Sequence, residues 1–493
     1  MINCDLLIVT VPFTDTPRPL QAPAVLKAVV EKHGYTAQTY DINHKFMTSG
    51  HRDIDFLKQY YLSGNTNDLS KLSVAEDYVE QVATLLLEKF NPRFIAVSVF
   101  TYQCQTFALL LAQNIRKLNS KVKIIFGGQG LTTNGIHAND SWPKECKQLG
   151  LIDHYIIAEG ENALVNLLKD GQGKGIDNTN WEQKLNIDDL PYPDYSNYKL
   201  EGYDKKTLMI TGSRGCVRQC TFCDIHKHWK RFVFRSGQSI ADEMISQSKK
   251  YRIYNFSFTD SLINGSMKAY RDFINVLARH NETTENKLSW GGQFIVRGIT
   301  HMTEEDWVNT KKAGVTSLVL GVESGSEKVR NHMKKQFSDQ DLDEFMEQAH
   351  KNNVNCTFLM IVGYPTEQQD DFIDTLKMFK RYQKYQSVIE SVVLGTTLGI
   401  LPGTPLAEDL IDDVDLNGGE NFWVYKKNPT LDFRERIKRR MIIGEECLKM
   451  GYRVDGNEAN HKLLHYLWNV YKGKLKQDIV DLNTSELHQQ KYS

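Results

Sequence analysis

Residues 212–226 have the sequence GSRGCVRQCTFCDIH. Three cysteines, Cys216, Cys220 and Cys223, stand within eight positions of this stretch, and two preceding glycines permit the tight turns of a metal-binding loop. Three thiolates on one loop can each bind one iron of a [4Fe–4S] cluster and leave the fourth iron open to a small molecule. A closed electron-transfer cluster would need a fourth protein thiolate. The triplet therefore predicts an iron–sulfur site with one open iron.

The same stretch also fits structural zinc. Together with His226, the three cysteines supply a Cys₃His set, which tetrahedral zinc accepts. Spacing alone does not separate the two metals, so a non-catalytic zinc-binding interaction protein remains an alternative at this point. The other five cysteines are isolated in the sequence and are expected to be small buried hydrophobic residues: Cys4, Cys104, Cys146, Cys356 and Cys447.

The composition is that of an ordinary soluble globular protein. A length of 493 residues predicts two or three domains. The 60 Lys and Arg residues nearly balance the 61 Asp and Glu residues, so no overall field favours nucleic acid or an anionic membrane. No run approaches the roughly 18 apolar residues of a membrane span. The amino terminus lacks a signal peptide pattern, and sparse cysteines suit a reducing compartment, so we expect a cytoplasmic protein.

Residues 1–170 alternate short apolar runs with helical patterns, which is typical of a doubly wound α/β domain. Small residues stand near the carboxyl ends of two predicted strands, Ser98 on one and Gly127 and Gly128 on the next. Ligands of such domains bind at these strand ends. The predicted strands occupy residues 5–10, 36–40, 94–99, 122–126 and 154–158.

Residues 171–205 are rich in Gly, Asp, Asn and Pro and predict a linker. A second series of strands and helices follows over residues 206–405. Six strands on this spacing predict a partial (β/α)₆ barrel and not a complete eightfold one. Residues 406–493 are predicted to be a helical region, with the clearest helices at 433–450 and 457–471. The six predicted barrel strands are 208–211, 254–258, 288–295, 317–320, 356–362 and 391–394.

The chain resembles the radical S-adenosylmethionine superfamily. The family hallmark, Cys-x-x-x-Cys-x-aromatic-Cys after the first barrel strand, is matched without a gap by Cys216, Cys220, Phe222 and Cys223. The resemblance implies that a [4Fe–4S] cluster on the three cysteines chelates S-adenosylmethionine and cleaves it reductively to methionine and a 5′-deoxyadenosyl radical. It also implies an electron donor such as flavodoxin or ferredoxin.

Later segments agree with this resemblance in order and spacing. The segment GVESGS, with Glu323 and Ser324, is similar to the family's ribose-binding segment, and a carboxylate can accept hydrogen bonds from two hydroxyls. The segment LMIVGYPTE, with Gly363, is similar to the glycine-rich fifth strand that passes close to the adenine. Asp260 follows the second predicted barrel strand, where the family places groups near the methionine amine.

A more specific resemblance is to the cobalamin (B12)-binding class of this superfamily. It rests on the amino-terminal α/β domain, the Leu-Pro-x-Pro-Asp linker at 190–194 and the GVESGS segment. The resemblance places the corrin over the strand ends of the first domain, with Ser98, Gly127 and Gly128 beside its nucleotide tail. The Asp-x-His-x-x-Gly motif that supplies a lower cobalt ligand in other B12 proteins is absent, as it is in many members of this class.

For this class the resemblance implies methylation of an unactivated carbon. The deoxyadenosyl radical would abstract hydrogen, and methylcobalamin would deliver the methyl group. A radical cyclase or rearrangement enzyme with a vestigial B12 domain is the alternative within the same architecture. No residue type in the sequence identifies the substrate or a further catalytic residue.

Overall fold

The computed structural model describes residues 2–14, 17–48, 73–132, 141–157, 159–170, 176–177, 185–395, 398–416 and 421–455. The chain divides into two compact units. The first comprises Met1–Ile210, Lys227–Val233 and Asp242–Ser257, and the second comprises the rest of the chain. The finer division predicted at residues 170, 205 and 405 stays a prediction.

The first unit is built on a five-stranded sheet in which the strands pair in parallel, in the order β2-β1-β3-β4-β5. The chain turns from one side of the sheet to the other between β1 and β3, the switch point at which doubly wound folds bind ligands. The predicted doubly wound fold is confirmed. The strands are β1 (Cys4–Thr10), β2 (Ala37–Asp41), β3 (Pro92–Ser98), β4 (Lys123–Gly127) and β5 (His154–Ile156).

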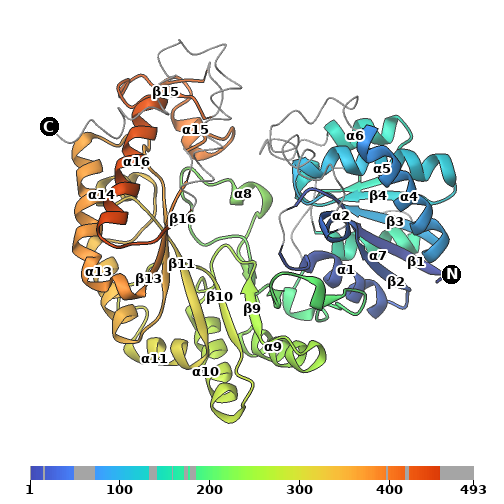
Figure 1. Ribbon diagram of the computed structural model, residues 1–493, viewed down its shortest axis with the longest axis horizontal. Coiled ribbons are helices and arrows are strands. Elements are labelled where there is room, and N and C mark those ends of the chain that lie inside the picture. Colours follow the sequence, from blue (N-terminus) through green and yellow to red (C-terminus); the bar gives the residue numbers. More distant parts are fainter. Residues whose placement is uncertain are drawn as a thin grey trace. The chain divides into compact units, whose positions relative to one another are not determined.

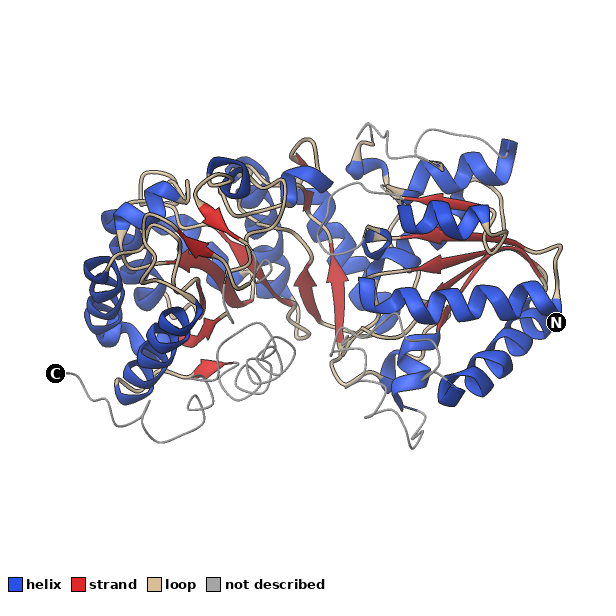
Figure 2. Ribbon diagram, turned by 90° about the horizontal axis from the view of Figure 1, so that it is seen from above, coloured by secondary structure: helices blue, strands red, loops and turns tan. Residues whose placement is uncertain are grey.

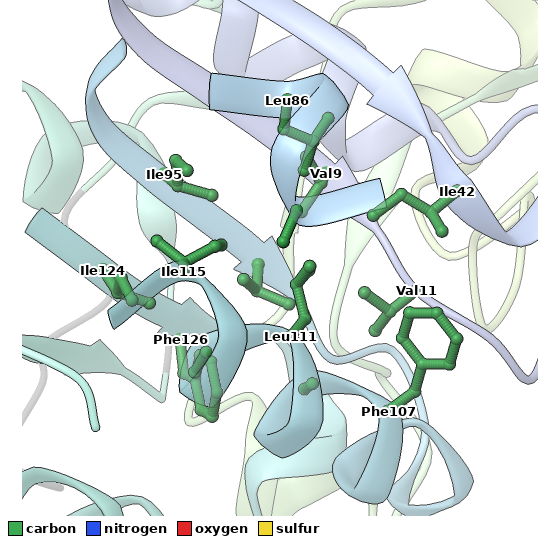
Figure 3. Close-up of a cluster of buried hydrophobic side chains, with 14 of the residues drawn as sticks. Val9, Val11, Ile42, Leu86, Ile95, Phe107, Leu111, Ile115, Ile124 and Phe126 are labelled. Atoms are coloured by element: carbon green, nitrogen blue, oxygen red, sulfur yellow. The ribbon is translucent and has the colours of Figure 1, made fainter. Parts of the chain in front are cut away.

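Helices cover both faces of this sheet because its strands are apolar on both sides (Figures 1 and 2). Alternate residues of β1 enter opposite cores: Leu7 and Val9 pack with α4 and α5, whereas Leu6 and Ile8 pack with α1 and α7. Figure 3 shows Val9 in the first of these cores. The helices of this unit are α1 (Gln21–Lys32), α2 (Ile42–Thr48), α4 (Ser73–Phe90), α5 (Gln105–Leu118), α6 (Ser141–Gln148) and α7 (Gly160–Asp170).

The second sheet has seven strands in the order β16-β13-β12-β11-β10-β9-β6, and the pairs from β10 to β16 are parallel. Six of these strands are the predicted barrel strands, which confirms the partial barrel. The seventh is a two-residue strand that the sequence did not predict. The strands are β6 (Thr207–Ile210), β9 (Asn255–Phe258), β10 (Ser289–Phe294), β11 (Val315–Glu323), β12 (Cys356–Met360), β13 (Ile389–Leu394) and β16 (Val454–Asp455).

Helices alternate with these strands along the chain, and side chains fix where several of them begin. The Thr303 and Ser338 side chains form capping boxes with the third residues of α11 and α13. The helices are α8 (Ile225–His228), α9 (Gly237–Tyr251), α10 (Met267–Thr283), α11 (Glu304–Lys312), α12 (Glu327–His332), α13 (Asp339–Lys351), α14 (Gln369–Tyr382), α15 (Pro405–Asp409) and α16 (Phe433–Lys449).

The carboxyl-terminal region contains the predicted helix at 433–450 as α16. The helix predicted at 457–471 lies outside the described residues. Two short strand pairs, β7 (Ser213–Arg214) with β8 (Val233–Phe234) and β14 (Val414–Asp415) with β15 (Val424–Tyr425), complete the described elements. No described helix is both long enough and apolar enough to cross a membrane.

Candidate functional site

The three cysteines lie on the loop that joins β6 to α8. Cys220 is buried, Cys216 and Cys223 are half-buried, and all three are free thiols. The backbone N–H of Arg218 points at the Cys216 Sγ atom, 3.4 Å away. Burial raises the pKa of all three thiols, that of Cys223 to about 11. Without a metal these groups are therefore neutral at pH 7, whereas a bound metal would hold them as thiolates.

The cysteine loop is anchored at Thr221, a buried residue that stands between Cys220 and Cys223 in the sequence. Its N–H donates to the carbonyl of Met333 (3.1 Å), and its carbonyl accepts from the N–H of Leu406 (2.8 Å). Its hydroxyl is hydrogen-bonded to the hydroxyl of Tyr364 at 2.9 Å. Tyr364 follows β12 and is also hydrogen-bonded to His332 Nδ1. Three separate segments of the barrel unit thus fix the loop at this residue.

Asp260 supports the beginning of the same loop. Its two carboxylate oxygens accept hydrogen bonds from the N–H of Gly212 (2.9 Å) and the hydroxyl of Ser213 (2.6 Å). The carboxyl group is buried, and burial raises its pKa to about 7 although the two hydrogen bonds act in the opposite direction. Both oxygens therefore hold the loop, and the expected contact of Asp260 with a methionine amine stays a prediction.

The stability of the protein should depend on pH through Asp260. Its native pKa of about 7 lies above the ordinary 3.8, so the folded chain keeps a proton that the unfolded chain loses between these values. The free energy of unfolding should therefore fall as pH rises from 4 to 7, by roughly 4 kcal/mol from this group. We expect Asp260→Asn to lose this component, measured by urea unfolding at several pH values. Parallel pH profiles of the two proteins would contradict the assignment.

Glu323 ends β11 in a strained conformation. Its φ is +68°, in the left-handed region that non-glycine residues rarely adopt, and the β11–β12 register shifts beside it. Such strain is common at functional sites. Its carboxylate forms an ion pair with Lys335 at 3.0 Å, and both side chains are nearly buried. A Cβ atom on Gly321 would lie 2.4 Å from Glu323 Oε1, so a side chain at this position would have to displace the Glu323 carboxylate.

Lys335 is a site residue that the sequence reasoning missed. Burial lowers its pKa, but the charges on Glu323 and Cys220 outweigh that effect and raise it. Its Nζ atom also lies 5.9 Å from the centre of the Phe222 ring. Lys335 therefore links the strained carboxylate to the cysteine loop. It is one of two adjacent lysines after α12, and spacing alone could not have selected it.

The structure also locates Ser324 and Gly363. Ser324 is buried in its own turn, where its hydroxyl accepts from the Ser326 N–H and its carbonyl accepts from Arg330 Nη1. Gly363 follows β12 with a φ of +77°. A Cβ atom there would lie 2.4 Å from the Arg436 side chain. The positive φ and the nearby Arg436 side chain therefore explain why residue 363 is glycine, without reference to a ligand.

In the first unit, Ser98 and Gly127 lie side by side, since they pair in register at the carboxyl ends of β3 and β4. A Cβ atom on Gly127 would make only an ordinary 3.8 Å contact. Gly128 differs, because its φ is +111° and a Cβ atom there would lie 2.5 Å from the Val99 carbonyl oxygen. The segments that follow β3 and β4 pack closely against each other at Val99 and Gly128, and this packing accounts for the glycine at 128.

Two further features mark the same sheet edge, and the sequence reasoning missed both. Phe100 and Tyr102, directly after β3, are 43% and 39% exposed although both are large aromatic residues. Thr14, after β1, has a buried hydroxyl with no hydrogen-bond partner in the described part of the chain. Exposed aromatic rings and an unsatisfied hydroxyl at the switch point are consistent with a ligand surface.

In the described arrangement, the thiols of the cysteine loop do not converge on one point. Within the described ranges, no three His, Cys, Asp or Glu side chains lie close enough together to hold one metal ion. The Nε2 atom of His226, the fourth ligand of the zinc alternative, lies 2.6 Å from the carbonyl oxygen of Arg218. A cubane cluster does not require the thiolates to meet at one point, because each binds a different iron.

Residues 210–379 match the family model described as the radical SAM superfamily. This region of the chain is a radical SAM domain. It begins at the end of β6, contains the cysteine loop and Glu323, and ends in α14. The resemblance seen in the sequence is confirmed.

The relatives of this chain are named for more than one activity. A protein of Pyrococcus horikoshii named as an uncharacterized methyltransferase is 23% identical over 330 residues, which are 62% of this chain and 68% of that protein. The anaerobic magnesium-protoporphyrin IX monomethyl ester cyclase of Cereibacter sphaeroides is 20% identical over 434 residues, 81% of this chain and 66% of the cyclase. The chain thus spans about two thirds of the length of these relatives.

The fold of this chain is similar to that of OxsB, a cobalamin-dependent S-adenosylmethionine radical enzyme solved with aqua-cobalamin and S-adenosylmethionine bound. The TM-score is 0.65 at 15% sequence identity, and the match covers 98% of this chain and 81% of OxsB. At this identity the similarity establishes the fold, from the first sheet through the partial barrel.

Proposed function

We propose that Cys216, Cys220 and Cys223 hold a [4Fe–4S] cluster with which the chain cleaves S-adenosylmethionine. The observation that carries this proposal is the donor set, in which three free thiols share one anchored loop and no fourth cysteine is present on it. An open iron follows from three ligands. A cluster bound there supplies one electron that breaks a C–S bond of S-adenosylmethionine and yields a 5′-deoxyadenosyl radical.

The surrounding residues would hold the loop and bind the nucleoside. Thr221 and Asp260 fix the loop from two sides, as their hydrogen bonds indicate. Lys335 places a positive charge beside the thiolates and favours their charged form. Glu323 is free to accept hydrogen bonds at the carboxylate oxygen that Lys335 does not occupy, which suits a ribose with two hydroxyls.

We further propose that the first unit binds cobalamin at the carboxyl edge of β1, β3 and β4. Ser98 and Gly127 leave room at this edge, Phe100 and Tyr102 expose aromatic surface, and the Thr14 hydroxyl lacks a partner among the described residues. These features fit a large, partly apolar ligand at a switch point. A bound corrinoid supplies a transferable methyl group. No residue of the described chain is assigned as a lower cobalt ligand.

The reaction that this combination best supports is methylation of an unactivated carbon, with a reduced flavodoxin or ferredoxin of the cytoplasm as the electron donor. The methyltransferase among the relatives and the similarity to OxsB support it. The second candidate is a radical cyclisation or rearrangement without cobalamin. It is favoured by the magnesium-protoporphyrin cyclase, whose match covers more of this chain than that of the methyltransferase.

Anaerobic turnover tests the proposal. The purified chain should contain about four irons and should convert S-adenosylmethionine with a strong reductant. Formation of both 5′-deoxyadenosine and S-adenosylhomocysteine, dependent on added hydroxocobalamin, is the result expected for methylation. Deoxyadenosine alone, unaffected by cobalamin, would favour the cyclase alternative. A colourless protein with one zinc and no turnover would contradict the radical chemistry.

Glu323→Gln should weaken the binding of S-adenosylmethionine. The substitution removes a charged acceptor of hydrogen bonds worth about 1.5 kcal/mol or more, so the dissociation constant should rise roughly tenfold. Equilibrium dialysis with labelled S-adenosylmethionine measures this effect. Glu347→Gln, on the exposed face of α13, is the matched control and should bind as the unmodified chain does. Equal affinities of all three proteins would exclude Glu323 from the nucleoside site.

A further inference from the structure

Three buried arginines of α16 lie at the carboxyl ends of β12 and β13. Arg436 packs against Gly363, which follows β12, and Arg440 donates from Nε to the carbonyl of Gly395, which follows β13, at 2.6 Å. Figure 1 shows α16 beside β13 and β16. The carboxyl ends of the strands are where barrel enzymes bind their ligands. These arginines therefore stand at the functional edge of the barrel.

Arg436 and Arg439 are paired within the chain. The Arg436 guanidinium is stacked 3.8 Å from the centre of the Trp423 ring and donates to the carbonyls of Trp423 and Leu431. Arg439 forms an ion pair with Glu367 at 2.9 Å. Arg439 thus has a carboxylate partner, and both Nη atoms of Arg436 donate to backbone carbonyls, whereas the Nε atom of Arg436 is buried without an acceptor among the described residues.

Arg440 has no such partner among the residues that the structure describes. Only its Nε atom donates a hydrogen bond, and its two Nη atoms are buried without any acceptor in the described part of the chain. The side chain is 1% exposed. Burial lowers the pKa of its guanidinium to about 10, and no described carboxylate acts on it. Arg440 remains charged at pH 7 all the same.

A buried guanidinium whose two Nη atoms have no acceptor is costly, and native proteins rarely keep one without a use for it. The two Nη groups of a guanidinium form a planar fork that matches the paired oxygens of a carboxylate or a phosphate. We propose that Arg440 is the receptor for an anionic group, a carboxylate or a phosphate, carried by the substrate. The assignment to the substrate rests on the proposed function, whereas the anion site itself does not.

Inorganic phosphate is the probe for the anion site. We expect the thermal unfolding midpoint of the full chain to rise with phosphate at constant ionic strength. Arg440→Met should lose this rise and, without phosphate, should unfold at the same or a higher temperature, since it removes an unpaired buried charge. Arg434→Met is the matched control, because Arg434 is exposed on the same helix, and it should keep the phosphate effect.

Arg440→Lys keeps the charge and loses the fork. This variant should fold and should bind phosphate at least roughly tenfold more weakly. It therefore tests the role of Arg440 in anion binding even if the methionine variant does not fold. A phosphate effect of equal size in the unmodified chain and in the Arg440 variants would overturn the proposal. So would the absence of any phosphate effect on the unmodified chain.

S-adenosylmethionine also carries a carboxylate, so the anion bound by Arg440 could come from the substrate or from S-adenosylmethionine. Measuring the binding of S-adenosylmethionine distinguishes these two sources. Unchanged binding of labelled S-adenosylmethionine by Arg440→Lys, with the iron content retained, assigns the anion to the substrate. A roughly tenfold loss would assign it to the methionine carboxylate and overturn the substrate assignment. Failure of the cluster proposal would appear separately, as a missing iron content in the unmodified chain.

Discussion

Replacing any one of Cys216, Cys220 and Cys223 by alanine should abolish S-adenosylmethionine cleavage. The cluster would be held by these three thiols alone on the loop. Removing one of them would leave the cubane with two protein ligands. We expect the iron content to fall from about four per chain to below one and 5′-deoxyadenosine to fall below detection. Iron and sulfide analysis and product chromatography measure the two effects.

The loss must come from the missing ligand and not from unfolding. Cys447→Ala is the matched control, because Cys447 is a buried free thiol of the same unit, at the far end of α16. It should keep its iron and its turnover. Circular dichroism should show that all four variants are folded. An alanine variant of the triplet that keeps full iron and full turnover would remove that cysteine from the cluster.

Fold and cysteine loop were largely predictable because their signals are local. Apolar runs of strand length placed ten of the twelve strands of the two sheets within about two residues of their bounds, and the triplet is contiguous in the sequence. β11 proved longer than the predicted run at 317–320 since Gly321 interrupts its apolar pattern. β16 escaped prediction because two residues carry no periodicity.

The residues around the site were less predictable, because their roles arise from partners distant in sequence. Lys335 is recognised only by its ion pair with Glu323 and its position beside Phe222 and Cys220, which tertiary folding creates. The arginines of α16 belong to a residue type that is mostly exposed unless paired, so their burial could not be inferred from the helix pattern. The resemblance places Gly128 beside a ligand, and the structure adds a reason for glycine that the sequence does not show, because the Val99 carbonyl oxygen occupies the space of a Cβ atom there.

Arg439→Met should strongly destabilise the protein. Arg439 and Glu367 form an ion pair in which both side chains are at least nine-tenths buried. Removing one partner leaves an uncompensated buried charge, which costs about 3–5 kcal/mol. Burial already raises the pKa of Glu367, so the variant should be less destabilised at pH 5, where Glu367 can take up a proton, than at pH 8. Urea unfolding at the two pH values measures both effects.

A second substitution separates the ion pair from simple packing. In Arg439→Met combined with Glu367→Gln neither charge of this pair remains, and most of the lost stability should return. Lys328→Met is the control. Lys328 is exposed and pairs with Asp371, so its loss should cost less than about 1 kcal/mol. Because Glu367 also accepts the N–H of Gly363, the pair ties α16 to the turn after β12. A double variant no more stable than the single one would show that packing, and not charge, holds this edge together.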